Sequence, residues 1–298
     1  MSDAPSEKTP GLSADEEQEV SHNQPPRAAV LHEIIRYQGD QELERTLAAL
    51  WWSALAAGLS MGLSLMAMGL FYARLPDGDS AQVVASIGYS AGFLAVILAR
   101  QQLFTENTLT AVLPVMTSPT LANFGRLMRL WGVVLLGNLA GTLLVAWVML
   151  ELPIFDSKTD AAFLEIGRKV MKNDVSQMFA KGIVSGWMIA TMVWMIPSME
   201  HAKIWIILMI TYLMALGDFT HIVVGSVEVS YLVWAGEETW RSFWLQFALP
   251  TLAGNIIGGS FIFGLISHAQ VRSDSGKPPS QLLKDGQARP SHSRDDKQ

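Results

Sequence analysis

The stretch QLFTENT, residues 102–108, decides how this chain is expected to fold. It is a polar, turn-prone interruption in a segment that is otherwise apolar enough to cross a membrane. Irregular backbone at membrane depth is tolerated only where it is buried in protein or lines a cavity. A second interruption, GDFTH at residues 217–221, lies in the latter half of the chain. We therefore predict that the two breaks meet and form a permeation site.

Composition places the chain among membrane proteins with several spans. Of its 298 residues, 50% are hydrophobic and only 16% are charged, whereas about 25% of the residues in a typical soluble domain are charged. The chain contains no cysteine, which excludes disulfides, thiolate metal sites and a cysteine nucleophile. The sequence also offers no metal-ligand cluster, no nucleophile paired with a base and no phosphate loop. We expect no enzyme, no cofactor, no metal and no nucleic-acid partner.

Uncharged runs divide residues 28–268 into six expected spans. They are expected at residues 46–73, 82–99 plus 109–115, 130–150, 182–197, 204–216 plus 222–235, and 244–267. The second and fifth spans contain the two breaks, so each is predicted to be a broken helix. Residues 28–45 are expected to form an amphipathic helix. The polar tails, 1–27 and 269–298, are expected to be disordered.

Two landmarks recur in the same order in both halves of the chain. Phe104-Thr105 is followed by GNLAG from Gly137, and Phe219-Thr220 is followed by GNIIG from Gly254. With three spans in each half, the two copies insert in opposite orientations, which predicts an inverted repeat with broken helices near the bilayer midplane. The distribution of Lys and Arg between the loops favours cytoplasmic termini.

These landmarks resemble those of the formate/nitrite transporter family. The resemblance covers roughly residues 47–267 and rests on Leu103-Phe104-Thr105, on the two Gly-Asn pairs at 137–138 and 254–255, and on His221. It implies an all-α membrane protein with six transmembrane helices and an aquaporin-like fold. It also implies a homopentamer in the bacterial inner membrane, with one pore per protomer, that passes small monovalent anions or their weak acids.

The resemblance further implies a pore centre formed by His221 and Thr105. An imidazole at membrane depth is costly unless it is paired or functional, and its ordinary pKa of about 6.5 suits a proton donor. A bare anion pays a large cost in hydrocarbon, so it would take a proton from His221, or from water, and cross as the neutral acid. Constrictions are expected from Tyr89, Phe93, Leu103, Phe104 and Met214, and an anion-attracting vestibule from Lys169 or Lys172. Core packing and solvated charges are the competing interpretations of these residues.

Several residues depart from the family pattern. Gly186 and Gly225 stand where asparagines are usual, and Arg100 and Glu106 are extra charges that we expect to pair across the first break. Glu228 lies near the His221 face and disfavours an anion route unless it is protonated or turned outward. Two alternatives therefore stay open: an aquaporin-like pore for neutral solutes, and a non-conducting membrane scaffold or sensor.

Overall fold

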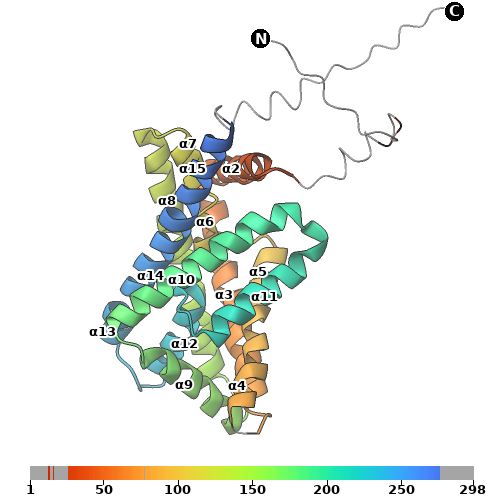
Figure 1. Ribbon diagram of the computed structural model, residues 1–298. Coiled ribbons are helices and arrows are strands. Elements are labelled where there is room, and N and C mark those ends of the chain that lie inside the picture. Colours follow the sequence, from red (N-terminus) through yellow and green to blue (C-terminus); the bar gives the residue numbers. More distant parts are fainter. Residues whose placement is uncertain (1–12, 14–15, 17–25, 77, 276–298) are drawn as a thin grey trace, which may run out of the picture.

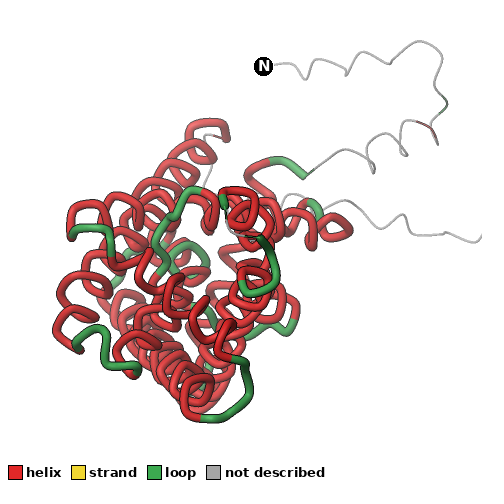
Figure 2. The backbone as a smooth tube through the Cα atoms, turned by 90° about the horizontal axis from the view of Figure 1, so that it is seen from below, coloured by secondary structure: helices red, strands yellow, loops and turns green. Residues whose placement is uncertain are grey.

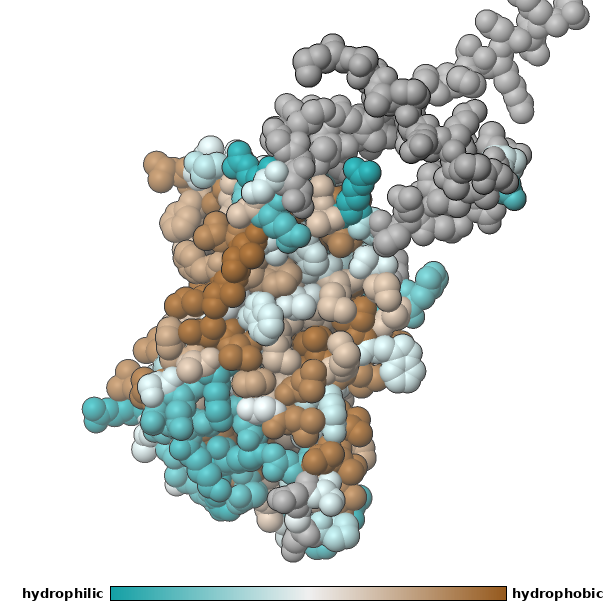
Figure 3. Space-filling model, viewed as in Figure 1, coloured by the Kyte–Doolittle hydropathy of each residue, from teal (hydrophilic) through white to brown (hydrophobic). Residues whose placement is uncertain are grey.

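The computed structural model describes residues 13, 16, 26–76 and 78–275, and within them the secondary structure is helical, without strands (Figure 2). Five helical segments are long and apolar enough to cross a membrane: Leu47–Tyr72, Ser80–Leu98, Leu121–Glu151, Val175–Ser198 and Trp240–Ser273. Hydrophobic residues dominate the middle of the face shown in Figure 3, and hydrophilic residues gather toward its ends. The predicted all-α membrane architecture is confirmed, whereas most of the two predicted tails lies outside the described residues.

The first half of the chain begins with a helix at one end of the molecule and finishes with the long helix α8. Its elements are α2 (Ala28–Glu44), α3 (Leu47–Tyr72), α4 (Asp79–Ala85), η1 (Ser86–Tyr89), α5 (Ser90–Leu98), α6 (Phe104–Asn107), α7 (Val112–Thr117) and α8 (Leu121–Glu151). Hydroxyl caps fix where the long helices begin, because Thr46 accepts from the backbone N–H of Ala49 and Thr120 from that of Asn123. With Thr120 as its cap, α8 begins well before the expected residue 130.

The second half runs from α9 to α15. Its elements are α9 (Ser157–Met171), α10 (Val175–Met195), η2 (Ile196–Ser198), η3 (Glu200–Ala202), α11 (Lys203–Leu216), α12 (Ile222–Trp234), α13 (Trp240–Ser242), η4 (Phe243–Ala248), α14 (Leu249–Ile256), η5 (Ile257–Gly264) and α15 (Leu265–Ser275). A stretch of π-helix, η4, precedes Pro250, which lies near the start of α14 and inside the continuous helical segment Trp240–Ser273. Helix α15 continues to Ser275, past the expected boundary at residue 268.

Glycines let two pairs of long helices approach to backbone contact. A Cβ on Gly58 of α3 would lie 2.2 Å from the carbonyl oxygen of Asn138 in α8. Likewise, a Cβ on Gly186 of α10 would lie 2.3 Å from the carbonyl oxygen of Asn255 in α14. Gly186 is thus required by the packing of its helix, and the asparagine that is usual at this position would collide with α14.

At each expected break one helix ends and another begins a few residues later, and the backbone has a left-handed residue at the matching place. Helix α5 ends at Leu98 before α6 begins at Phe104, and α11 ends at Leu216 before α12 begins at Ile222. Each break contains one residue in the left-handed region, Arg100 with φ 54° and Asp218 with φ 51°. Such a conformation costs an L-residue roughly 1–2 kcal/mol. Its recurrence three residues before each half-helix cap is structural support for an internal repeat.

Candidate functional site: a cavity where the two breaks meet

Two buried asparagines hold the broken backbone. The amide oxygen of Asn138 accepts from the backbone N–H of Phe104 at 2.9 Å, and its nitrogen donates to the carbonyl of Gln102 at 2.8 Å. Asn255 does the same in the second break, where it accepts from the N–H of Ile222 at 2.9 Å and donates to the carbonyl of Thr220 at 3.2 Å. Each amide therefore satisfies backbone groups that the interruption of a helix leaves without partners. We call these two residues the asparagine clamps.

The clamps correct the predicted register of the repeat. They make Phe104 equivalent to Ile222, and Leu103 equivalent to His221, because these residues hold matching positions around each clamp. The two Gly-Asn motifs do correspond, but the two Phe-Thr pairs do not, since Phe219 lies three residues too early. The Phe-Thr match was a coincidence of residue type.

His221 and Thr105 meet where the breaks converge. The Thr105 Oγ1 lies 2.7 Å from His221 Nε2, and both side chains are buried. His221 Nδ1 accepts from the backbone N–H groups of Val223 and Val224, each at 3.3 Å. These two donors assign the ring proton to Nε2, which then donates to Thr105. The geometry favours a neutral imidazole, because a second proton on Nδ1 would face the two N–H groups.

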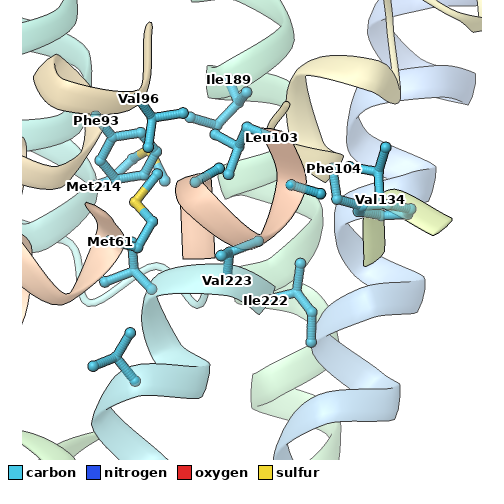
Figure 4. Packing of buried hydrophobic residues seen from close by; sticks show 14 of the residues in the cluster. Met61, Phe93, Val96, Leu103, Phe104, Val134, Ile189, Met214, Ile222 and Val223 are labelled. Carbon is cyan, nitrogen blue, oxygen red and sulfur yellow. The ribbon is translucent and has the colours of Figure 1, made fainter. Parts of the chain in front are cut away.

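An apolar plug lies beside this pair. It consists of Phe93, Leu103 and Met214, which are fully buried and lie close together in Figure 4. The Phe93 ring packs edge-on against His221, with 5.2 Å between ring centroids, and Tyr89 stacks behind Phe93 at 5.5 Å.

The fifth expected constriction residue, Phe104, lies elsewhere. Its ring packs against Trp131 at 5.7 Å and lies beside Val134 in Figure 4. The structure thus places Phe104 in the helix packing on the α8 side of the break, away from the plug formed by Phe93, Leu103 and Met214.

A small cavity leads from His221 toward the α9 end of the molecule. This central cavity has a volume of about 60 Å³, and its lining includes Tyr89, Met214, His221 and Glu228. It adjoins a wider outer basin of about 560 Å³ that carries three lysines, Lys158, Lys169 and Lys172. Lys169 lines both spaces. Only the outer basin has more lysines than acidic residues, because Glu165 is the one acidic residue of its lining, whereas Asp218 and Glu228 line the central cavity.

The charges of the basin and the cavity are partly neutralised. The Lys169 ammonium pairs with Asp218 of the second break at 2.5 Å, and Lys172 lies 3.8 Å from Glu165 in a largely exposed position. Sequence reasoning named both lysines but missed Asp218, whose only signal was its position inside the break. Glu228 is 5% exposed and lines the central cavity, so it is not turned outward. No hydrogen bond or ion pair joins its side chain to another described residue.

A third space is lined in part by α2, the helix that lies toward the other end of the molecule from α9 in Figure 1. This inner chamber has a volume of about 480 Å³, and it extends to Ile97 and Gln102, next to the plug. Arg100 and Glu106 both line it, but the ion pair predicted between them is absent from residues 26–76 and 78–275. The left-handed backbone at Arg100 carries its exposed side chain into the chamber mouth.

The family model for formate/nitrite transporters matches residues 29–269 of the chain. The inner membrane protein YfdC of Escherichia coli K12 is 59% identical over 250 residues, which cover 84% of this chain and 81% of that protein. The formate channel FocA of Haemophilus influenzae is 23% identical over 70% of this chain and 83% of its own length. These matches confirm the family resemblance.

Solved structures share the fold. A pentameric formate channel with formate bound superimposes with a TM-score of 0.63 at 18% identity, over 75% of this chain and 97% of that one. An ion channel titled as an FNT family member gives 0.66 at 21% identity, over 82% and 96%.

Proposed function

Because this chain belongs to the formate/nitrite transporter family, we propose that it is a membrane pore for small monovalent anions and their weak acids. The observation that carries the proposal is the hydrogen bond between Thr105 and His221, buried where two breaks in separate helices converge. The named relatives that are channels or transporters for formate support the same substrate class. They also support transport rather than catalysis.

We propose an aquaporin-like inverted repeat with six crossings. In this arrangement α11 and α12 together make one crossing, and the segment 80–98 continues through α6 and α7 to make another. The matching asparagine clamps support the repeat. The solved pentameric formate channel and the name of the E. coli relative support a homopentamer with one pore per protomer in the bacterial inner membrane. The loop charges support cytoplasmic termini, which places the inner chamber on the cytoplasmic side.

The proposed route begins in the outer basin, where Lys158, Lys169 and Lys172 attract anions by charge. His221 lines the central cavity and donates to the buried hydroxyl of Thr105 behind it, which leaves the Thr105 proton free to point at an anion that passes this pair. Because the imidazole is held neutral by its contacts at Nδ1, we assign the transferred proton to water rather than to the ring. The neutral acid then passes the apolar plug at a much smaller desolvation cost than the anion.

Glu228 sets a condition on this route. Its carboxyl faces the central cavity, about two helical turns after His221, so an anion can approach only while that carboxyl is neutral. For the same reason, Glu228 favours a conduit for neutral solutes as the second candidate function.

Uptake into proteoliposomes tests the proposal. Labelled formate, nitrite and acetate would be offered at pH values on either side of the ordinary histidine pKa of about 6.5. We expect faster uptake at acidic pH, and loss of uptake in His221→Asn, which retains a side chain able to cap α12, and in Thr105→Val. His201→Ala changes an exposed histidine outside the site and should behave as wild type.

Two results would overturn the anion pore. Swelling of vesicles in glycerol or urea without anion uptake would establish the neutral-solute conduit. Neither uptake nor swelling, from protein that remains folded and assembled, would favour the non-conducting scaffold or sensor.

A further inference from the structure

Gly225 makes room in the central cavity for the carboxyl of Glu228. A Cβ on Gly225 would lie 2.7 Å from the Phe247 ring and 3.9 Å from Oε2 of Glu228. The asparagine that is usual at position 225 would therefore need space that this ring and this carboxyl now occupy. Side chains on a helix lean toward its N-terminus, so the Glu228 carboxyl lies over Gly225, on the His221 side of its own position. The buried acid is thus directed along the proposed route.

Few ionisable groups face this carboxyl. Besides His221, the lining of the central cavity contributes Lys169 from α9, Asp218 from the second break, Tyr72 from α3 and Tyr89 from η1. Lys169 and Asp218 pair with each other at 2.5 Å, and His221 is held neutral by its contacts at Nδ1. No other charged side chain of the described residues lines this cavity. No cation is therefore left over to stabilise Glu228 as a carboxylate.

A carboxylic acid and a small carboxylate that are confined together share one proton. Two like charges in one site cannot both ionise, so a pair of carboxylates holds a proton between them. The central cavity, with a volume of about 60 Å³, admits only a few water-sized groups. An anion that enters it is stripped of most of its water, as the Glu228 carboxyl already is. Since both groups then pay a desolvation penalty when ionised, the proton can move from one to the other at little cost.

We propose that Glu228 donates the proton that turns the permeating anion into its neutral acid. This inference rests on the proposed function, in which water remains the source of the proton. The O–H bond of Glu228 breaks as a new O–H bond forms on an oxygen of formate or nitrite, which leaves Glu228 as a carboxylate and the solute as a neutral acid. The acid moves on past His221 to the plug, and Glu228 takes its next proton from water in the outer basin.

This role makes Glu228 a specificity-determining residue. Until it has regained its proton, its charge repels the following anion, so each anion that passes is tied to one proton. The anion of a strong acid, such as nitrate or chloride, is too weak a base to accept the proton and is excluded.

Uptake of labelled formate into proteoliposomes at acidic and at neutral pH tests this role. In Glu228→Gln the amide has nearly the same shape but no acidic proton, so uptake should fall at least about tenfold at both pH values. Glu228→Asp keeps a carboxylic acid and should retain more uptake than Glu228→Gln. Glu151→Gln, at an exposed position at the end of α8, should behave as wild type. Unchanged or faster uptake by Glu228→Gln would overturn the proposal, because Glu228 would then do no more than repel anions. A nitrate current through the wild type would overturn the exclusion of strong-acid anions.

Infrared difference spectroscopy on the full-length protein in lipid gives a readout without flux. Nitrite, which has no C=O group of its own, should reduce the C=O stretching band of a protonated carboxyl in the wild type, and this change should be missing in Glu228→Gln. Uptake by the wild type without the spectral change would overturn the proton donor and leave the proposed function intact. The spectral change without uptake would overturn the proposed function and leave the proton donor intact, and absence of both would overturn both.

Discussion

Removing the amide of Asn138 should cost more stability than removing that of Asn255, although the two clamps make matching hydrogen bonds to their breaks. In Asn138→Ala two buried backbone groups lose their hydrogen-bond partners: the N–H of Phe104 and the carbonyl of Gln102. An orphaned buried group costs about 1–3 kcal/mol, so the variant should lose about 2–6 kcal/mol of unfolding free energy.

Asn255→Ala should lose about half as much. It orphans the N–H of Ile222, but the carbonyl of Thr220 retains a second donor, the Ser185 hydroxyl at 2.5 Å. One orphaned group corresponds to about 1–3 kcal/mol. Adding Ser185→Ala to Asn255→Ala removes that second donor, so the double variant should fall to the level of Asn138→Ala.

Unfolding in mixed micelles, or the midpoint of thermal unfolding in one detergent, provides the comparison. All three variants and the single Ser185→Ala control would be measured under the same conditions. The reasoning fails if Asn255→Ala is as destabilising as Asn138→Ala, or if Ser185→Ala adds no more to Asn255→Ala than it costs alone.

Two further predictions concern the helix packing and the outer surface. The Arg168 guanidinium donates two hydrogen bonds to Glu237 and lowers the pKa of that carboxyl. The pair with Arg168 therefore stabilises the fold at pH values above the unfolded glutamate pKa of about 4.3. This contribution is lost as pH falls through the lower pKa that Glu237 has in the folded state. The difference in Tm between wild type and Glu237→Gln should therefore narrow as pH falls below about 4.3 and vanish below the lowered folded pKa. The neighbouring Glu238→Gln, at a carboxyl without a hydrogen bond to Arg168, serves as the control. Gly258→Ala would place a Cβ 2.0 Å from a backbone carbonyl of α10 and should cost about 1–3 kcal/mol or more. Gly125→Ala, at an open helical position, should instead gain about 0.5–1 kcal/mol, and a matched loss of Tm in both alanine variants would contradict this reasoning.

Polarity and helix length made the main features of the fold predictable. The two breaks appear in the sequence as polar runs between apolar segments too short to cross a membrane alone, and the structure interrupts helices at both. The juxtaposition of Thr105 and His221 was expected from the family resemblance, and the structure places the two side chains in contact.

Features that depend on backbone conformation could not be predicted. The correspondence between the two breaks is set by the clamps and by the left-handed residues Arg100 and Asp218. Aspartate adopts this conformation occasionally, but arginine does so rarely, and its sequence position gave no indication of it. The same conformation turns Arg100 away from a pairing with Glu106 and lets Asp218 reach Lys169, more than forty residues away. The ion pair expected between Arg100 and Glu106, six residues apart, is therefore not found among the described residues. Asp218 instead pairs with Lys169, which belongs to a different helix.

The asparagine clamps bear on whether this fold could use an energy source to drive a solute against its gradient. A clamp cannot release its break without leaving buried backbone groups unpaired, so passage through the plug falls to side-chain rotation of Phe93, Leu103 and Met214 within a fixed backbone frame. Rocking of whole helix bundles takes microseconds to milliseconds, whereas side-chain rotations are far faster. A frame of this kind would give the proposed pore no second, oppositely open form in which a loaded site is carried across. In such a pore, solute would flow only down its own combined gradient, in the direction set by the concentrations on the two sides of the membrane.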